Sequence, residues 1–235
     1  MPLNRKSFLA LLLLVALCGA PIRAQHTAPL AVGERIQNLD QFKQRLEQYH
    51  ACTCTCGCYA HDLDRQADRA IVYLRSRVAH NPQHQKLALV LDIDETTLSN
   101  YDEMQKAGFT YDPKTWNAWV ASEQAPAIPG TLRLFREAQK LGVSVFFLTG
   151  RPDTQRAATE QNLHAQGFDG YAKLLMRGPA DLKAATIAFK SAQRARIVAD
   201  GYTLAESVGD QWSDLRGTPR AEYSVKLPNP YYFIP

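Results

Sequence analysis

The spacing of hydrophobic residues changes near residue 86 and divides the sequence into two parts. Before that point, apolar residues recur at helical intervals, which predicts amphipathic helices over residues 36–50 and 63–78. The first helix presents Ile36, Leu39, Phe42 and Leu46 on one face, and the second presents Leu63, Ala67, Ala70, Ile71, Leu74 and Val78. We therefore expect an N-terminal helical extension over residues 25–85, ahead of the main fold.

Continuous apolar runs begin after Lys86 and are typical of strands buried on both faces. The clearest runs cover residues 87–91 and 143–148, and weaker ones lie at 171–176 and 207–208. Helical segments separate them at residues 132–140, 154–166 and 182–198. This alternation predicts a doubly wound, parallel α/β sheet over residues 86–235, with ligands bound at the carboxyl ends of the strands.

One connection in this pattern, at about residues 100–129, is unusually long. It is rich in aromatic residues: Tyr101, Phe109, Tyr111, Trp116 and Trp119. A connection of this length inside a compact domain is usually a functional insertion, so we expect a small cap over the site. Its aromatic rings would either stack on a substrate or pack the cap onto the core, and the sequence leaves both alternatives open.

The first 24 residues have the three-part pattern of a secretory signal peptide. Arg5 and Lys6 precede an apolar run over residues 8–17, and small residues follow up to Ala24. The run is shorter than the roughly 20 residues that span a bilayer. Cleavage after Ala24 is favoured, so we expect an exported protein, periplasmic or secreted, without a membrane attachment. A membrane anchor, a buried helix and lipidation at Cys18 are the alternatives.

Net charge gives little reason to expect a polyanionic partner. Removing residues 1–24 takes away three basic and no acidic residues, so the charge falls from +4 to +1. The basic balance of the whole chain is therefore no argument for nucleic acid or an anionic membrane. The 211 residues left of 235 suit one domain with an inserted cap.

Polar residues follow the first two predicted strands, where a ligand would bind. Asp92 and Asp94 are close enough to disfavour joint ionisation unless a cation neutralises them or one keeps a proton. With a hard divalent cation present, Asp92 is suited to attack phosphorus and Asp94 to transfer the proton. Thr149 and Gly150 offer a hydroxyl and backbone amides to an anion. Helix-capping turns are the structural alternative for both segments.

Two later segments complete the candidate site. Lys190 follows the third predicted strand, where an ammonium group would balance phosphate charge. A surface lysine is the alternative, and Lys183 is the second candidate for this role. Asp210 and Asp214 follow the fourth strand, and paired carboxylates suit a hard metal ion.

These segments resemble, in order, the four motifs of the haloacid dehalogenase superfamily. The motifs are residues 92–96 (DIDET), 148–151 (LTGR), Lys190 and residues 209–215 (GDQWSDL). The sequence is more similar still to the acid phosphatase branch that includes plant vegetative storage proteins and bacterial secreted acid phosphatases. Residues 98–100 (LSN), 189–191 (FKS) with Arg194, and 226–231 (KLPNPY) carry that similarity, which covers about residues 59–235.

The resemblance implies a Rossmann-like core and a magnesium-dependent acid phosphatase acting on small phosphomonoesters. It implies that Asp92 is the nucleophile, that Asp94 is the general acid and base, and that Thr149 and Lys190 contact the phosphoryl group. It also implies that the carbonyl of Asp94, together with Asp92, Asp210 and Asp214, holds Mg²⁺. Gly150 and the two cap tryptophans, Trp116 and Trp119, are the remaining candidates for substrate binding.

Four alternating cysteines, Cys52, Cys54, Cys56 and Cys58, are not a recognised feature of this family. In an extended strand their side chains would point the same way, with neighbours about 6.5 Å apart, so bridges within the run need turns. Gly57 would help to form one. Export favours disulfides, and binding of a soft metal such as Cu(I) or zinc is the alternative.

Two other functions share the same motifs. A non-catalytic storage or binding protein would be expected to lack the nucleophile, whereas Asp92 and every other motif residue are present. A phosphotransferase would hand the phosphoryl group to an alcohol instead of water, and the sequence does not separate it from a hydrolase. The physiological ester and the oligomeric state are likewise not determined by these residues.

Overall fold

Five parallel strands form the centre of the computed structural model, which describes residues 36–54 and 57–234. Their order across the sheet is β3-β2-β1-β4-β5, and the bounds are β1 Lys86–Leu91, β2 Ser144–Pro152, β3 Lys173–Arg177, β4 Tyr202–Gly209 and β5 Tyr223–Lys226. β1 is central because four of its residues pair with β2 and all six with β4. The carboxyl ends of β1 and β4 therefore lie next to each other.

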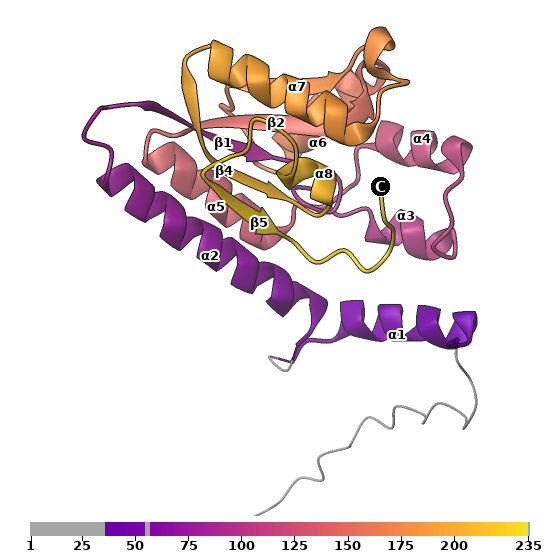
Figure 1. The fold of residues 1–235 in the computed structure, drawn as a ribbon. Helices are drawn as coiled ribbons and strands as arrows, with labels where there is room; N and C mark the ends of the chain where they lie inside the picture. Colours follow the sequence, from indigo (N-terminus) through magenta and orange to yellow (C-terminus); the bar gives the residue numbers. More distant parts are fainter. Residues whose placement is uncertain (1–35, 55–56, 235) are drawn as a thin grey trace, which may run out of the picture. The chain divides into compact units, whose positions relative to one another are not determined.

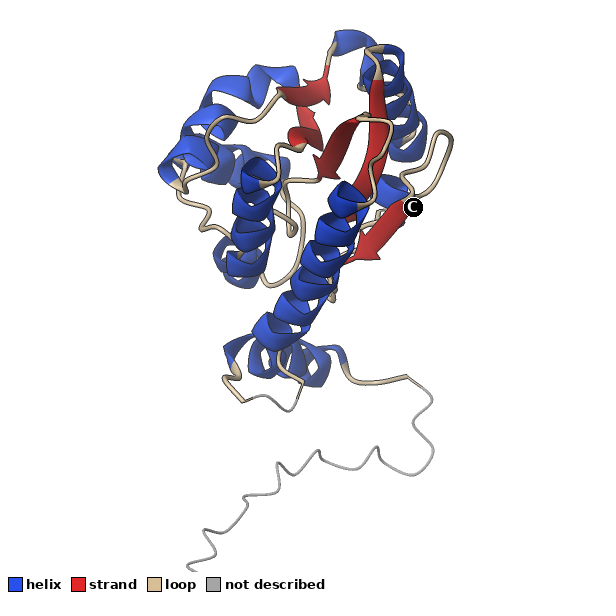
Figure 2. Cartoon of the chain, turned by 90° about the vertical axis from the view of Figure 1, so that its left-hand side faces the viewer, coloured by secondary structure: helices blue, strands red, loops and turns tan. Residues whose placement is uncertain are grey.

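Helices cover both faces of this sheet (Figure 1). On one face α7 (Thr186–Ala199) packs Phe189 and Ile197 against Val90 and Phe146. On the other, α2 (Tyr59–Ala79) and α5 (Pro129–Lys140) share a core with Leu89 of β1. Figure 2 shows the strands flanked by helices. The expected doubly wound α/β fold is confirmed.

The structure largely confirms the expected helices and strands, with shifted ends. The predicted second helix is α2, which buries Leu63, Ala67, Ala70 and Leu74 as expected. Residues 154–166 form η1 (Asp153–Gln155) followed by α6 (Arg156–Ala165), and residues 182–185 lie outside the helices, after η2 (Pro179–Asp181). β5 and the short α8 (Trp212–Leu215) had no counterpart in the predicted pattern.

The predicted first helix is α1 (Leu39–Ala51), capped by the side chain of Asn38. Only Leu46 of its predicted apolar face is buried, whereas Ile36, Leu39 and Phe42 are 86%, 64% and 42% exposed. The described residues from Asn38 onward, including α1 and α2, form one compact unit. The signal-peptide prediction for residues 1–24 lies outside the described residues.

The long connection after β1 contains two helices, α3 (Tyr101–Lys106) and α4 (Pro113–Ser122). Asp112 caps α4 by accepting hydrogen bonds from the backbone amides of Lys114 and Thr115. α4 contacts α6, and the side chain of Asn162 on α6 bonds both backbone groups of Ala125. The insertion is thereby fastened to the core through α4 and its return segment.

Cys52 and Cys58 are joined by a disulfide between the C-cap of α1 and the N-cap of α2. Cys54 is also disulfide-bonded, and Gly57 supplies the turn with a φ of +115°. The expectation of disulfides in this segment is confirmed for Cys52 and Cys58, while Cys56 lies outside the described residues. In the described part of the chain, none of the helices is long and apolar enough to cross a membrane.

Candidate active site

Asp92 lies at the carboxyl end of β1, and a lysine from α7 joins it to the segment after β4. The backbone amide of Asp92 donates to the carbonyl of Val208 on β4 over 3.1 Å. Lys190 Nζ donates to Asp92 Oδ1 over 2.5 Å and also to Asp214 Oδ1. All three charged side chains are buried. The sheet and α7 thus bring together three of the residues that the sequence singled out, whereas Lys183 is exposed.

Burial and charge act in opposite directions on this cluster. Burial lowers the pKa of Lys190, but the charges of Asp214 and Asp92 and their hydrogen bonds outweigh it, so the pKa is raised. Burial raises the pKa of Asp92 well above its usual range. The positive charge of Lys190 opposes this rise, and the negative charges of Asp214 and Asp210 add to it. Burial also raises the pKa of Asp210. One ammonium group therefore does not neutralise these carboxylates, and a cation would favour their ionised forms.

Asp210 is held in place by three side-chain donors. Thr96 Oγ1 donates to Asp210 Oδ1 over 3.1 Å. Gln211 Nε2 and Asn229 Nδ2 each donate to Oδ2 over 2.7 Å. These bonds fix the orientation of the carboxylate between the first motif, the segment after β4 and the C-terminal segment.

The donor set fits a hard divalent cation. Carboxylate oxygens of Asp92, Asp210 and Asp214 lie within 4.8 Å of one another, and oxygen ligands are those that Mg²⁺ prefers. Both oxygens of Asp214 already accept hydrogen bonds, Oδ1 from Lys190 and Oδ2 from the amide of Gln211. Asp214 is therefore suited to support the cluster, whereas Asp92 and Asp210 also line the adjoining cavity.

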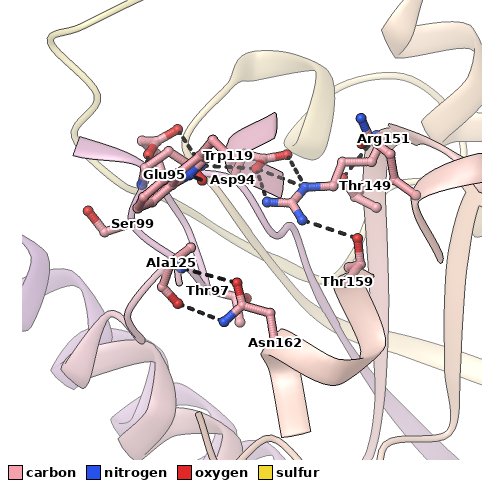
Figure 3. Close-up of polar contacts among 12 residues, drawn as sticks. Asp94, Glu95, Thr97, Ser99, Trp119, Ala125, Thr149, Arg151, Thr159 and Asn162 are labelled. Carbon is pink, nitrogen blue, oxygen red and sulfur yellow. Dashed lines mark hydrogen bonds and ion pairs between the residues drawn. The ribbon is translucent and has the colours of Figure 1, made fainter. Parts of the chain in front are cut away.

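Asp94 does not join the carboxylate cluster through its side chain. Arg151 Nη2 and Nε donate to Asp94 Oδ1 over 2.7 and 3.0 Å, and Arg151 Nη1 donates to Thr159 over 3.1 Å (Figure 3). Asn100 Nδ2 donates to the same oxygen over 3.0 Å. These donors hold the Asp94 carboxylate beside Asp92 at the surface of the cavity.

The second motif places a hydroxyl and a glycine at the end of β2. Thr149 is fully buried, and its Oγ1 accepts the backbone N–H of Arg151 over 3.1 Å, which leaves its own hydrogen able to donate. Gly150 lines the cavity, whereas Thr149 is not among the described residues that do. The structure therefore brings Gly150 directly to the site and Thr149 one residue behind it.

A cavity of about 680 Å³ opens above these groups. Asp92, Asp94, Lys190 and Asp210 line it at the ends of the strands. Its other walls come from the cap, the segment after β3 and the C-terminal segment, and include Met104, Phe109, Tyr111, Trp116, Leu182, Thr186, Tyr231, Tyr232, Phe233 and Ile234. A polar base and largely apolar walls would accept a phosphate group joined to a larger organic part.

The two tryptophans of the cap have different positions. Trp116 lines the cavity and lies beside Tyr111, with ring centroids 6.3 Å apart. Trp119 is buried away from the lining, and its Nε1 donates to Asn100 Oδ1 over 2.8 Å. The structure therefore does not bring Trp119 to the substrate cavity, because its indole N–H is used to hold Asn100 and the cap in place.

The sequence pattern of the HAD superfamily, subfamily IIIB (Acid phosphatase), matches residues 18–235. The chain belongs to this family. Among curated proteins, it is 36% identical to Acid phosphatase 1 of Solanum lycopersicum over 75% of this chain and 69% of that protein. It is 35% identical to a Stem 31 kDa glycoprotein of Glycine max, and 32% identical to Vegetative storage protein 1 of Arabidopsis thaliana. The match spans 65% and 55% of those two proteins.

A solved structure supports the same fold. The Class C acid phosphatase from Bacillus anthracis superposes with a TM-score of 0.66 over 83% of this chain and 86% of that one, at 23% identity. Membership in the family makes the chain a phosphatase, and it implies small phosphomonoesters as the substrate class. HAD phosphatases generally use a divalent metal, and the buried aspartates described above could hold one.

Several polar residues of the acid phosphatase site were not assigned a role from the sequence. Asn100 contacts Asp94, Glu95 and Trp119, and Tyr232 donates to Glu95 Oε2 over 2.8 Å. Burial, with the charges of Asp94 and Asp210, raises the pKa of Glu95 to about 8. Asn100 belongs to residues 98–100, which resemble the acid phosphatase branch, so the sequence offered a reason to single it out. Tyr232 lies one residue beyond the resembling segment 226–231, so the sequence offered none.

Proposed function

We propose that the protein is an exported, magnesium-dependent acid phosphatase that hydrolyses phosphomonoesters through a phospho-aspartate at Asp92. The observation that carries this proposal is the position of Asp92. It lies in the lining of the cavity, held by the ammonium group of Lys190 and close to the carboxylates of Asp210 and Asp214. An oriented carboxylate with compensating positive charge is what in-line attack on phosphorus requires.

In the first step Asp92 attacks the phosphorus atom and the bond to the ester oxygen breaks. Lys190, the Gly150 backbone and the Thr149 hydroxyl are the groups that would stabilise negative charge on the phosphoryl oxygens. Asp94 gives its proton to the leaving alcohol. The products of this step are the free alcohol and Asp92 carrying the phosphoryl group.

In the second step Asp94 accepts a proton from a water molecule, which attacks the phosphorus and releases inorganic phosphate. Arg151 and Asn100 hold Asp94 for both steps through the hydrogen bonds described above. Asp92, Asp210 and the Asp94 carbonyl would hold Mg²⁺, with Asp214 in support. When bound, the ion supplies positive charge that neutralises the phosphate and favours ionised Asp92.

The cavity supports a broad choice of esters with an aromatic leaving group. Trp116 and Tyr111 present flat aromatic rings in the wall of the cavity, and stacking on such rings tolerates many ring systems. We therefore propose that aryl phosphates and nucleoside monophosphates are hydrolysed ahead of small sugar phosphates. Two of the relatives named above are a storage protein and a stem glycoprotein, but retention of Asp92 with Lys190, Asp210 and Asp214 favours an enzyme.

Removal of the metal tests this function directly. EDTA should abolish hydrolysis of an aryl phosphate, and added magnesium should restore it, because the carboxylates then regain their counter-charge. Asp210→Ala deletes a hard ligand, so calorimetry should show magnesium affinity at least about tenfold weaker than in the wild type.

Asp68→Ala is the matched control, because Asp68 is exposed on α2 and pairs with Arg133. This variant should bind magnesium and turn over substrate as the wild type does. Full activity after exhaustive chelation, or unchanged magnesium affinity in Asp210→Ala, would refute the metal-dependent mechanism.

A further inference from the structure

A cluster of aromatic rings connects the N-terminal helix to the wall of the substrate cavity. The cluster consists of Tyr49 and His50 of α1, Tyr59 of α2, Tyr101 of α3, Phe109 and Tyr231. Its members come from four separate segments of the chain. Neither α1 nor Tyr59 carries a catalytic motif, so the phosphatase chemistry does not account for this arrangement.

His50 is the central contact of this aromatic cluster. Its ring stacks on Tyr101 with centroids 3.3 Å apart and an interplanar angle of 2°. A hydrogen bond of 2.8 Å joins His50 Nδ1 and the hydroxyl oxygen of Tyr231. Tyr59 meets Tyr231 edge to face at 5.4 Å. The last turn of α1 thus touches the cap through Tyr101 and the C-terminal segment through Tyr231.

The far side of the aromatic cluster faces the substrate. Phe109 and Tyr231 are stacked with centroids 5.8 Å apart, and both line the cavity above Asp92. The Phe109 ring has no group that could bind phosphate, and the Tyr231 hydroxyl is bonded to His50, so this pair is suited to the organic part of an ester. The backbone amide of Tyr231 donates to Asn229 Oδ1 over 2.9 Å, and Asn229 in turn holds Asp210. A movement confined to the Tyr231 side chain would therefore change the shape of the cavity and leave the aspartates in place.

Outside the aromatic cluster, α1 also meets the cap where Gln105 Nε2 donates to Glu47 Oε1 over 3.4 Å. Leu46 is its one buried residue, and Leu39 and Phe42 are exposed. The Cys52–Cys58 disulfide ties the last turn of α1 to the first turn of α2, and Tyr49 donates to Asp62 of α2 over 2.7 Å. Tyr59 directly follows Cys58, so the bridge lies at the base of the aromatic cluster.

We propose that the Cys52–Cys58 disulfide determines leaving-group selection, by holding His50 against Tyr231 in the wall of the cavity. The inference rests on the proposed phosphatase activity and extends it to substrate choice. A dithiol that gives two electrons and two protons to the Cys52–Cys58 bond leaves two thiols and becomes a disulfide itself. The last turn of α1 is then held to α2 only by noncovalent contacts such as that of Tyr49 with Asp62, and selection becomes dependent on the redox state.

The test compares two esters on the full chain, oxidised and then reduced with dithiothreitol. Because Cys54 is also disulfide-bonded, peptide mass spectrometry after alkylation identifies when the Cys52 and Cys58 thiols in particular are released. On this proposal the ring of naphthyl phosphate contacts Phe109 and Tyr231, whereas the smaller glycerol phosphate does not. Reduction should lower kcat/KM for naphthyl phosphate by about three- to tenfold, the worth of an aromatic contact, and leave glycerol phosphate within about twofold.

Two variants separate this account from general loosening of the fold. His50→Ala should show the low kcat/KM for naphthyl phosphate already when oxidised, and reduction should lower it no further. Tyr231→Phe, which keeps the ring and loses the hydroxyl, should give a partial loss of the same kind. Phe42→Ala is the matched control on α1, since Phe42 faces solvent, and it should respond to reduction as the wild type does.

An equal effect of reduction on both esters, or none on either, would overturn the inference. A full response to reduction in His50→Ala would do the same, because the effect would then bypass the aromatic cluster. If the oxidised protein hydrolyses neither ester, the proposed function fails and this inference with it.

Discussion

Lys190 and Glu206 are both buried, but only the lysine has partners of opposite charge. Lys190 lies between Asp92 and Asp214, which keep it protonated. Glu206 lies within β4 beside Leu89 and Tyr223, and neither of its side-chain oxygens has a hydrogen-bond partner in the described structure. Burial raises the pKa of Glu206 to about 9, so below that pH this carboxyl group is mainly protonated in the folded protein.

The neutral Glu206 makes stability depend on pH. The unfolded chain ionises this group above its ordinary pKa of 4.5, whereas the folded chain does so only near pH 9. The free energy of unfolding should therefore fall as pH rises between these values, by up to about 1.4 kcal/mol per pH unit. Urea unfolding at pH 5 and pH 8 should show this loss, and Glu206→Gln, which cannot ionise, should show less of it.

Glu160→Gln is the control for that measurement, because Glu160 is a partly exposed residue paired with Arg156. Its substitution should leave the pH dependence of wild type intact and change stability by less than about 1 kcal/mol. If Glu206→Gln retained the full wild-type loss between pH 5 and pH 8, Glu206 would not be the group responsible.

At the scale of elements, the cap is attached through one tryptophan and faces the substrate with the other. Trp116→Ala should lower kcat/KM for an aryl phosphate by about tenfold to a hundredfold if its ring stacks on the leaving group. Glycerol phosphate should be hydrolysed almost as before. Comparison of the two esters under matched conditions measures the effect.

Trp119→Phe is the counterpart on the same helix, since it keeps an aromatic ring and removes the donor to Asn100. It should destabilise the protein by about 1 kcal/mol, seen in thermal unfolding, and change both esters alike. An equal loss on both esters in Trp116→Ala would show that this ring, too, only holds the cap.

The strands that the sequence predicted clearly are those whose apolar runs are unbroken. β1 was clear because five consecutive residues after Lys86 are buried and apolar. For β4, the sequence predicted a strand at residues 207–208 only. Glu206 interrupts the apolar run of this strand, and a charged residue at that position is more typical of a loop. β5 is four residues long and only Val225 among them is buried, so no run marked it.

For the whole molecule, the site could be predicted better than its surroundings. Asp92, Lys190, Asp210 and Asp214 meet because each follows a strand or lies on the helix that packs over the sheet. Contacts made by the cap and the C-terminal segment depend on how these segments fold back over the sheet, and no sequence pattern indicated them. The burial of Trp119 and the stacking of His50 on Tyr101 belong to this second kind.

Export is a property of the whole chain and has its own test. If residues 1–24 are a signal peptide, the mature protein should begin at Gln25 and be recovered from the periplasm or the medium. Mass spectrometry of the purified protein gives its N-terminus. An intact Met1 on a soluble cytoplasmic protein would contradict export and leave the catalytic account unaffected.

The phosphoryl group on Asp92 is the most direct test of the account. Wild-type protein turning over an aryl phosphate should be quenched in acid and its peptides searched for one added phosphoryl group. The added phosphoryl group should be found on Asp92. Asp92→Asn should carry none and should turn over at least about a thousandfold more slowly, with its fold retained. Phosphoryl transfer to another residue, or turnover by Asp92→Asn within about tenfold of the wild type, would contradict it.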